Sequence, residues 1–163
     1  MVTFDISITG KDMFDYNVYH NYRHFQGIIS LLLGIAMLIL CVAAYIQGGN
    51  ISYILITGFL GIYFTILTPV KIYFKSYTQV KMTPSFMKPI QYTLSEEKLI
   101  IEQDGAKAEV PMSDILKVRD TGKSIVLYVS AVRAYIFPKK QLEGRVDSIK
   151  DIISKSQAKN IKL

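Results

Sequence analysis

The sequence predicts a membrane α-helical hairpin of two transmembrane helices joined to a small α+β cytoplasmic domain. Two patterns indicate this fold class. No Asp, Glu, Lys or Arg occurs from His24 to Val70, and after residue 90 short alternating segments are separated by turn residues. The chain has 163 residues, of which 50% are hydrophobic and 20% are charged. This composition excludes a disordered protein, because disordered chains combine low hydrophobicity with high charge.

Two apolar segments, 27–46 and 51–70, are each long enough to cross a membrane as a helix. Each has 20 residues, and at about 1.5 Å per residue such a helix spans roughly 30 Å. The break at 47–50 contains Gly and Asn and is typical of a tight turn, so the helices must be antiparallel neighbours. Buried core helices of a soluble protein are the disfavoured alternative, because they usually carry a polar stripe. A signal peptide is disfavoured because a second span follows at once.

Basic residues indicate that both termini face the cytoplasm. They flank the two segments, whereas the connecting turn is uncharged, and the positive-inside rule places such flanks on the cytoplasmic side. The residues concerned are Arg23, Lys71, Lys75, Lys81 and Lys88. We therefore expect a multi-pass protein of the cell (cytoplasmic) membrane. Tyrosines and phenylalanines at the segment ends are typical of an interfacial aromatic belt.

Residues 1–26 predict a cytoplasmic strand and helix that lead into the membrane. Residues 2–9 alternate apolar and polar side chains, as in a half-buried strand. A lone strand is unstable, so we expect this strand to join the sheet that follows the hairpin, on the same side of the membrane. Thr9 and Asp12 predict the start of a helix over 11–26, Thr9 as its cap and Asp12 as a favourable charge in its first turn.

Residues 71–90 predict a basic juxtamembrane helix and linker, because the composition is helical up to Met82 and Pro84 and Pro89 end it. Residues 91–163 predict about six short antiparallel strands, and Asp104-Gly105 is a strong hairpin signal. The predicted strands cover 91–95, 98–103, 107–110, 115–119, 124–130 and 134–137. The other predicted turns are 96–97, 121–123 and 131–133, with a break at 111–114.

From Lys139 the apolar period becomes helical, so we expect a C-terminal helix that covers a small curved sheet. One face of this helix is apolar and the other is basic. The apolar face has Leu142, Val146, Ile149, Ile152 and Ile153, and the outward face has Arg145, Lys150 and Lys155.

The segment after Pro111 contains a specific series of motifs. They are Ser113-Asp114-Ile115, Lys117-Val118, Thr121, Leu127-Tyr128 and Ile136-Phe137-Pro138-Lys139-Lys140. Through these motifs, the opening residues 8–20 and the uncharged hairpin, nearly the whole chain resembles the YcxB-like family of small bacterial membrane proteins. Family members often have Trp where this chain has Met112. The resemblance implies a cytoplasmic domain similar to bacterial pleckstrin-homology-like domains, with its sheet completed by the N-terminal strand, and it implies no established chemistry.

Candidate metal and nucleophile residues are few. His20 and His24 share a face of the predicted helix and could hold a metal, but a site needs a third and fourth ligand. Interfacial histidines are the favoured alternative. Cys41 lies in mid-span without a basic neighbour, so we expect a small apolar residue rather than a reactive thiolate. No glycine-rich phosphate loop and no nucleophile motif occurs, so we expect no metal and no cofactor.

Two carboxylate pairs could in principle perform acid–base chemistry. They are Asp12 with Asp15 and Glu96 with Glu97. Such chemistry needs burial that separates the two pKa values, and we expect water to screen both pairs. Neither span contains an ionisable residue, which disfavours a transporter. The sequence therefore predicts no catalytic residue.

The lysines that follow the second span have two possible roles. Each basic residue near an anionic leaflet contributes about 1 kcal/mol, so Lys71 and Lys75, and more weakly Lys81 and Lys88, could bind anionic lipid; topology signalling is the alternative. Small residues in the spans allow close packing within the hairpin or against a protein partner or second copy. These are Gly27, Ser30, Gly34, Gly58 and Gly61. The net charge of +6 is spread too thinly for nucleic-acid binding.

The leading expected function is therefore that of a non-enzymatic, membrane-tethered scaffold, which binds a protein segment or a lipid headgroup close to the bilayer. The alternative is self-protection against a membrane-active bacteriocin or toxin, which the resemblance allows because some bacterial pleckstrin-like proteins are immunity factors. A membrane enzyme is third, because no catalytic set of residues was found.

Overall fold

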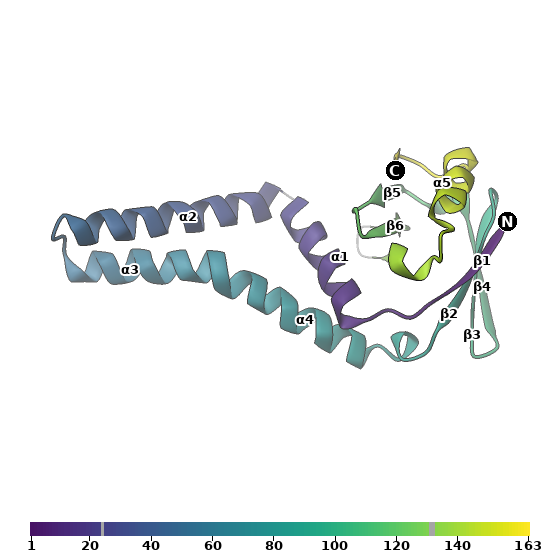
Figure 1. Ribbon diagram of the computed structural model, residues 1–163, viewed down its shortest axis with the longest axis horizontal. Helices are drawn as coiled ribbons and strands as arrows, with labels where there is room; N and C mark the ends of the chain where they lie inside the picture. Colours follow the sequence, from purple (N-terminus) through teal and green to yellow (C-terminus); the bar gives the residue numbers. More distant parts are fainter. Residues whose placement is uncertain (24, 131–132) are drawn as a thin grey trace. The chain divides into compact units, whose positions relative to one another are not determined.

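The structure is a computed structural model that describes residues 1–23, 25–130 and 133–163, without the side chain of Gln26. The chain divides into two compact units (Figure 1). The helical unit is Asn17–Ser76, and the sheet unit combines Met1–Tyr16 with Tyr77–Leu163. Two predicted features, the ligand His24 and most of the turn at 131–133, lie outside the described residues.

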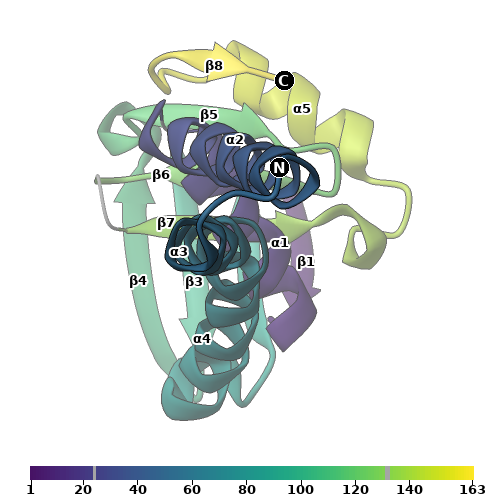
Figure 2. The same cartoon turned by 90° about the vertical axis from the view of Figure 1, so that its left-hand side faces the viewer.

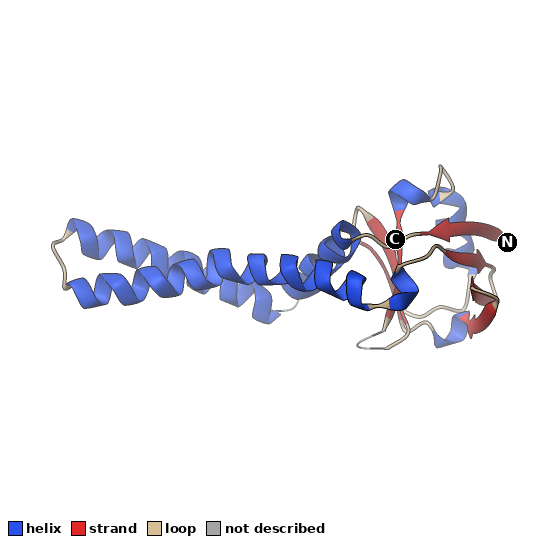
Figure 3. Cartoon of the chain, turned by 90° about the horizontal axis from the view of Figure 1, so that it is seen from below, coloured by secondary structure: helices blue, strands red, loops and turns tan. Residues whose placement is uncertain are grey.

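Two apolar helices make up most of the helical unit. Helix α2 (Phe25–Ile46) and helix α3 (Ile51–Ile62) lie side by side (Figures 1 and 3). The turn between them ends at Asn50, whose side chain accepts a hydrogen bond from the Ser52 amide at 2.8 Å. In the described chain, two helical stretches are long and apolar enough to cross a membrane, Gly27–Ile46 and Ile51–Met82, and 11% of the apolar window of each is buried.

The described helices cover the helical segments that the sequence predicts. Helix α1 (Gly10–Arg23) and the start of α2 cover the predicted helix over 11–26, apart from His24, which lies outside the described residues. The predicted span 51–70 and the predicted juxtamembrane helix that follows it form one continuous helix, in which α3 continues through a π-helix (Tyr63–Leu67) into α4 (Thr68–Met82).

Pro69 lies within this continuous helix and does not end it. Proline has no amide hydrogen and its ring clashes with the preceding turn of an ordinary α-helix. Here the preceding turn is a π-helix, in which the Thr68 amide donates to the Tyr63 carbonyl five residues earlier. This wider turn accommodates the proline, so the apolar and basic parts of the helix stay joined.

Glycines allow α2 and the second long helix to approach closely. A Cβ atom at Gly34 would lie 2.8 Å from Phe64 Cβ, and one at Gly61 would lie 2.6 Å from Leu38 Cγ. These contacts lie within the helical unit. For these two glycines the structure therefore favours the alternative of packing within the helix pair.

We expect Gly34→Ala and Gly61→Ala each to destabilise the helix pair by about 1–3 kcal/mol, because the added methyl group overlaps atoms of the facing helix. Thermal unfolding of the full chain in detergent, followed by circular dichroism, measures the loss. Gly58→Ala is the matched control, because its Cβ would meet only Cys41 Sγ, at 3.1 Å. Equal melting temperatures for all three variants would contradict the expected close packing.

The sheet unit contains two four-stranded sheets whose strands cross (Figure 2). The first sheet has the order β1-β2-β3-β4 and the second has the order β7-β6-β5-β8. The first sheet consists of β1 (Val2–Ile6), β2 (Ile90–Leu94), β3 (Lys98–Gln103) and β4 (Ala106–Pro111). The second consists of β5 (Lys117–Asp120), β6 (Ser124–Tyr128), β7 (Ala134–Pro138) and β8 (Ile161–Lys162).

The N-terminal strand joins the sheet that follows the helices, so this prediction is confirmed. β1 pairs antiparallel with β2, from Val2 opposite Leu94 to Ile6 opposite Ile90. The prediction of a single antiparallel sheet is wrong. Pro111 and the short helix η3 (Met112–Asp114) separate β4 from β5, which belongs to the other sheet. The unpredicted strand β8 also pairs parallel to β5.

An apolar core fills the space between the sheets. Phe137 of β7 is fully buried, and its ring centroid lies 5.1 Å from that of Phe4 and 5.0 Å from that of Tyr92. Helix α5 (Val146–Lys155) adds the fully buried Ile149 and Ile153. The apolar face predicted for the C-terminal helix is therefore confirmed.

Helix α5 begins at Val146 rather than at the predicted Lys139. Glu143 and Gly144 have φ values of +47° and +78°, which an α-helix cannot contain, so only a short 3₁₀ turn forms before them. Lys150 was predicted to face solvent. It is half-buried and binds Asp120 instead.

Candidate functional site

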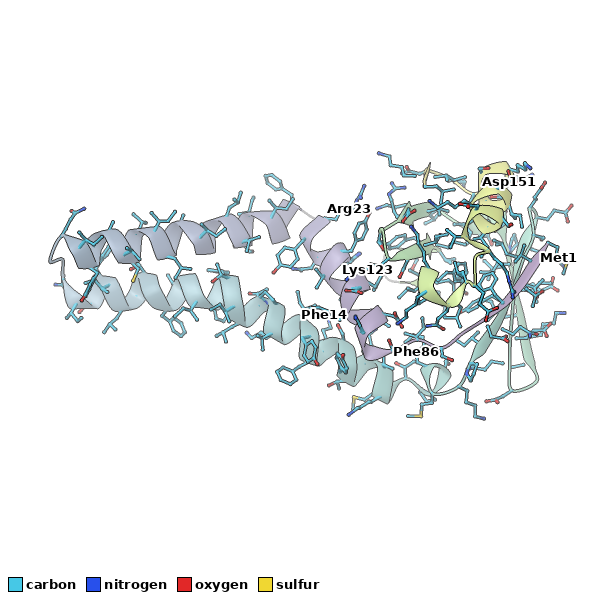
Figure 4. All side chains as sticks on the ribbon, in the orientation of Figure 1. Met1, Phe14, Arg23, Phe86, Lys123 and Asp151 are labelled. Atoms are coloured by element: carbon cyan, nitrogen blue, oxygen red, sulfur yellow. The ribbon has the colours of Figure 1, made fainter. Side chains whose placement is uncertain are left out.

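Ion pairs connect the start of α1 to distant parts of the sheet unit. The Lys123 Nζ atom lies 2.7 Å from Asp15 Oδ1, and Lys140 Nζ lies 2.9 Å from Asp12 Oδ1 (Lys123 is labelled in Figure 4). Asp12 and Lys140 are 128 residues apart in the sequence. These pairs hold the first turns of α1 against the turn between β5 and β6 and against the residues that follow β7.

Asp12 is a structural residue rather than a solvated one. Its Oδ2 atom accepts hydrogen bonds from the Thr9 amide at 3.0 Å and the Thr9 hydroxyl at 2.5 Å, and the Asp12 amide donates to Thr9 Oγ1 at 3.3 Å. The predicted cap at Thr9 is confirmed. The expectation that water screens Asp12 is wrong, because the residue is 5% exposed. Asp12 and Thr9 therefore cap the start of the helix reciprocally, each side chain accepting a hydrogen bond from the backbone amide of the other residue.

Asp120 is the centre of a second group of contacts. Lys139 and Lys150 approach its carboxylate at 2.7 and 2.6 Å, and the Gly122 amide donates to it at 2.7 Å. Burial acts to raise the pKa of the Asp120 carboxyl, but the hydrogen bonds from the two lysines and the glycine amide outweigh this effect and lower the pKa to about 2. Asp120 is therefore a stable anion that joins the β5–β6 turn to α5.

The five predicted basic residues do not form one site. Arg23, Lys71 and Lys75 belong to the helical unit, whereas Lys81 and Lys88 belong to the sheet unit. Lys71 and Lys75 are exposed and one helical turn apart on α4.

Three of these basic residues have contacts that sequence reasoning did not find. The Arg23 guanidinium donates to the Tyr19 hydroxyl. Lys71 Nζ donates to the Tyr63 hydroxyl at 3.0 Å. Lys88 forms an ion pair with Asp104 at 2.9 Å, at the tip of the β3–β4 hairpin. The charge of Lys88 is thus paired with that of the Asp104 carboxylate, so Lys88 is less available to bind anionic lipid.

The other candidate residues lie in ordinary environments. Glu96 and Glu97 are exposed in the β2–β3 turn. Cys41 Sγ donates to the Ile54 carbonyl at 3.4 Å, between the long helices. Among the described residues, no group of three His, Cys, Asp or Glu side chains is arranged to hold a metal. The pair formed by His20 and His24 stays a prediction, because His24 lies outside the described residues.

A groove that sequence reasoning missed opens in the sheet unit, between β7 and the inner face of the first sheet. Its volume is about 440 Å³. β4, which contributes Ala108 to the groove, is exposed along most of its length. Apolar side chains form most of its wall, including Phe86 (labelled in Figure 4), and Arg133 lies at its rim. The small residues Ala108 and Ala134 were the available signal, since they leave space where larger side chains would fill it.

The motifs behind the family resemblance belong to the second sheet and its ion pairs. Val118, Leu127 and Phe137 are fully buried, whereas Lys139 and Lys140 bind Asp120 and Asp12. These residues therefore maintain the core of the sheet unit and hold the first turn of α1 within it. They do not line up as a catalytic set.

Comparison with known proteins identifies a related family. Residues 94–153 match the model of the family described as YcxB-like protein, a segment that runs from the end of β2 into α5. No curated protein and no solved structure matches the chain. Together with the buried motif residues, the match identifies the segment 94–153 as YcxB-like, the family that the sequence resembles.

Proposed function

We propose that this chain is an integral protein of the cell membrane, in which the pair of apolar helices holds a non-enzymatic binding module at the cytoplasmic face. Large apolar side chains point outward along both helices and support membrane insertion, because water-exposed apolar patches of this extent are rare in soluble proteins. Among them are Ile39, Leu55 and Phe59, each at least 63% exposed.

The position of the apolar helices in the sequence, between two paired strands of the sheet unit, carries this proposal. Both helices lie in the stretch between β1 and β2, and the ends of that stretch, Ile6 and Ile90, are opposite each other in the first sheet. A chain that leaves a sheet and returns to the neighbouring strand must cross a bilayer an even number of times. Two spanning helices satisfy this requirement and would leave both termini on the same side, and the lysines that follow the second apolar segment support a cytoplasmic location for that side.

The strand arrangement supports a pleckstrin-homology-like module. Four strands form one sheet, the next three pair antiparallel in the other, and a helix follows the last of them. This order of elements is similar to the pleckstrin-homology-like arrangement that the family resemblance implies. The helix pair then replaces the connection between its first two strands, and the binding module stays directly attached to the membrane.

Cysteine labelling tests the proposed topology. In a Cys41→Ala background, we expect Gln47→Cys to react with a membrane-impermeant maleimide on intact cells. Asp5→Cys and Lys159→Cys should react only after permeabilisation. All three positions are exposed in the structure, so accessibility depends on the side of the membrane. Equal labelling of all three on intact cells, or extraction of the chain by alkaline carbonate, would overturn the proposal.

We further propose that Lys71 and Lys75 bind anionic lipid. We expect Lys71→Gln with Lys75→Gln to reduce the phosphatidylglycerol that co-purifies with the full chain by about half or more, since each lysine contributes about 1 kcal/mol. Lipid mass spectrometry of nanodisc samples measures this. The control with the same charge change is Lys159→Gln with Lys162→Gln, on the sheet unit. Equal lipid retention by the two double variants would leave topology signalling as the role of these lysines.

A further inference from the structure

The edges of the two sheets differ in how far they are open to pairing with another strand. An exposed edge presents unpaired backbone groups, and proteins commonly block it with charges, prolines, short strands or covering side chains. The described sheets have four edge strands, β1, β4, β7 and β8. Three of them carry such a block.

Each blocked edge uses a different device. On β1 and just after it, the Arg145 guanidinium donates to the Thr3 carbonyl, and the Gln141 amide bonds both backbone groups of Ser7 at 2.8 and 2.9 Å. β4 carries the charged Lys107 and Glu109 in its central part. β8 has two residues. These three edges are therefore poor templates for a further strand.

The β7 edge has none of these devices in its central part. Its sequence, AYIFP, contains no charged residue and no proline before its last position. The Val129 amide donates to the Arg133 carbonyl and the Lys139 amide to the Lys123 carbonyl. Since antiparallel pairing alternates along a strand, these two bonds direct the backbone groups of Tyr135 and Phe137 toward β6. The backbone groups of Ala134 and Ile136 then face away from the sheet.

The groove lies along this same edge. Ala134, Tyr135 and Ile136 of β7 form one wall, and Tyr92 and Ile101 of the first sheet form another. Among the described residues that line it, Arg133 is the only charged side chain, and no acid is present. The lining therefore complements an apolar side chain accompanied by a carboxylate.

We propose that β7 is a docking edge for an extended acidic peptide segment of a partner protein. The peptide pairs with the outward backbone groups of Ala134 and Ile136 as an additional strand. It places an apolar side chain in the groove and a carboxylate against Arg133. Backbone pairing supplies affinity and the groove supplies specificity, as in other β-augmentation complexes. The inference rests on the proposed role of the sheet unit as a binding module.

A selection experiment tests this with the full chain in phosphatidylcholine nanodiscs. The probe is a random library of 12-residue displayed peptides, and the selected sequences are then synthesised. We expect them to alternate apolar and polar residues and to contain Asp or Glu. Methylation of alternate peptide amides should weaken binding by about tenfold or more, because each lost hydrogen bond contributes about 1 kcal/mol. Binding should also slow hydrogen exchange at the amides of Ala134 and Ile136.

Two matched pairs of variants locate the site. Ala134→Pro, which removes one outward amide at a position where an edge strand tolerates proline, should weaken binding by about tenfold. Lys107→Pro, on the β4 edge, should leave binding unchanged. Arg133→Glu should weaken binding by about fivefold or more. Lys159→Glu makes the same change of charge at an exposed position that does not line the groove, and it should leave binding unchanged.

Several outcomes would overturn the inference. They are a library without binders, binders that tolerate both Ala134→Pro and Arg133→Glu, and binders indifferent to amide methylation, which would indicate simple apolar partitioning. Dimers that Ala134→Pro abolishes would instead indicate that β7 pairs with a second copy of the chain. Cysteine labelling of each variant confirms its insertion, so failure of the docking edge is distinguishable from failure of the proposed membrane topology.

Discussion

Replacing Phe137 with alanine is expected to destabilise the sheet unit by about 3–5 kcal/mol. The side chain is fully buried and joins the two sheets, because its ring packs edge-on against Phe4 of β1 and Tyr92 of β2. Truncation leaves a cavity that none of these strands can close without moving its sheet. Most single domains have a total stability of about 5–15 kcal/mol, so the loss is a large fraction.

Hydrogen exchange of the full chain in detergent measures the effect. The amides of β6, which is buried along its whole length, should exchange markedly faster in Phe137→Ala. Leu116→Ala is the control, because this residue is 49% exposed and such positions cost about 0.5 kcal/mol or less. A loss below about 1 kcal/mol in Phe137→Ala would mean that the sheets do not share this core.

Most individual strands could be predicted because their signals are local. The short apolar run within 98–103, bounded by turn residues on both sides, predicted β3 with its observed bounds. The Asp104-Gly105 turn has φ values of +51° and +80°, the left-handed geometry that favours this dipeptide in tight hairpins. In both cases the residues that determine the structure are next to one another in the sequence.

The division into two sheets could not be predicted in the same way. An alternating pattern indicates that a strand has one buried face, but it does not indicate which strand lies next to it in the sheet. Nothing in the composition of β4 and β5 reveals that they belong to different sheets. The short strand β8 depends wholly on its tertiary partner, since its backbone pairs with β5 across more than forty residues.

The candidate site was harder to predict than the fold, because its geometry depends on distant contacts. Asp12 is buried and forms an ion pair with Lys140, and no local pattern connects the two. The groove is lined by residues from distant parts of the chain, among them Tyr92 and Ile136, so its shape depends on how the two sheets pack. The charged residues themselves could be identified from the sequence, but Asp12 and Lys150 were expected to face water, whereas the structure buries Asp12 and pairs Lys150 with Asp120.

The second large effect is expected from Asp120→Asn, which keeps the size of the side chain and removes its charge. Lys139 and Lys150 then lose the carboxylate that both contact, and the stability of the sheet unit should fall by about 2–3 kcal/mol at neutral pH. Asp151→Asn is the matched control. Its ion pair with Lys155 is equally short at 2.6 Å but 57% exposed on both sides, and such pairs contribute about 0–1 kcal/mol.

The pH dependence separates loss of charge from a general disturbance of packing. The pKa of Asp120 is lowered from 3.8 to about 2, so its contribution is complete above about pH 4 and disappears as the pH falls toward 2. The stability difference between the original chain and Asp120→Asn, measured by urea unfolding of the detergent-solubilised protein, should therefore shrink over this range. A difference that stays constant down to pH 2 would show that Asp120 acts through its shape, and the two lysines would then need another partner for their charge.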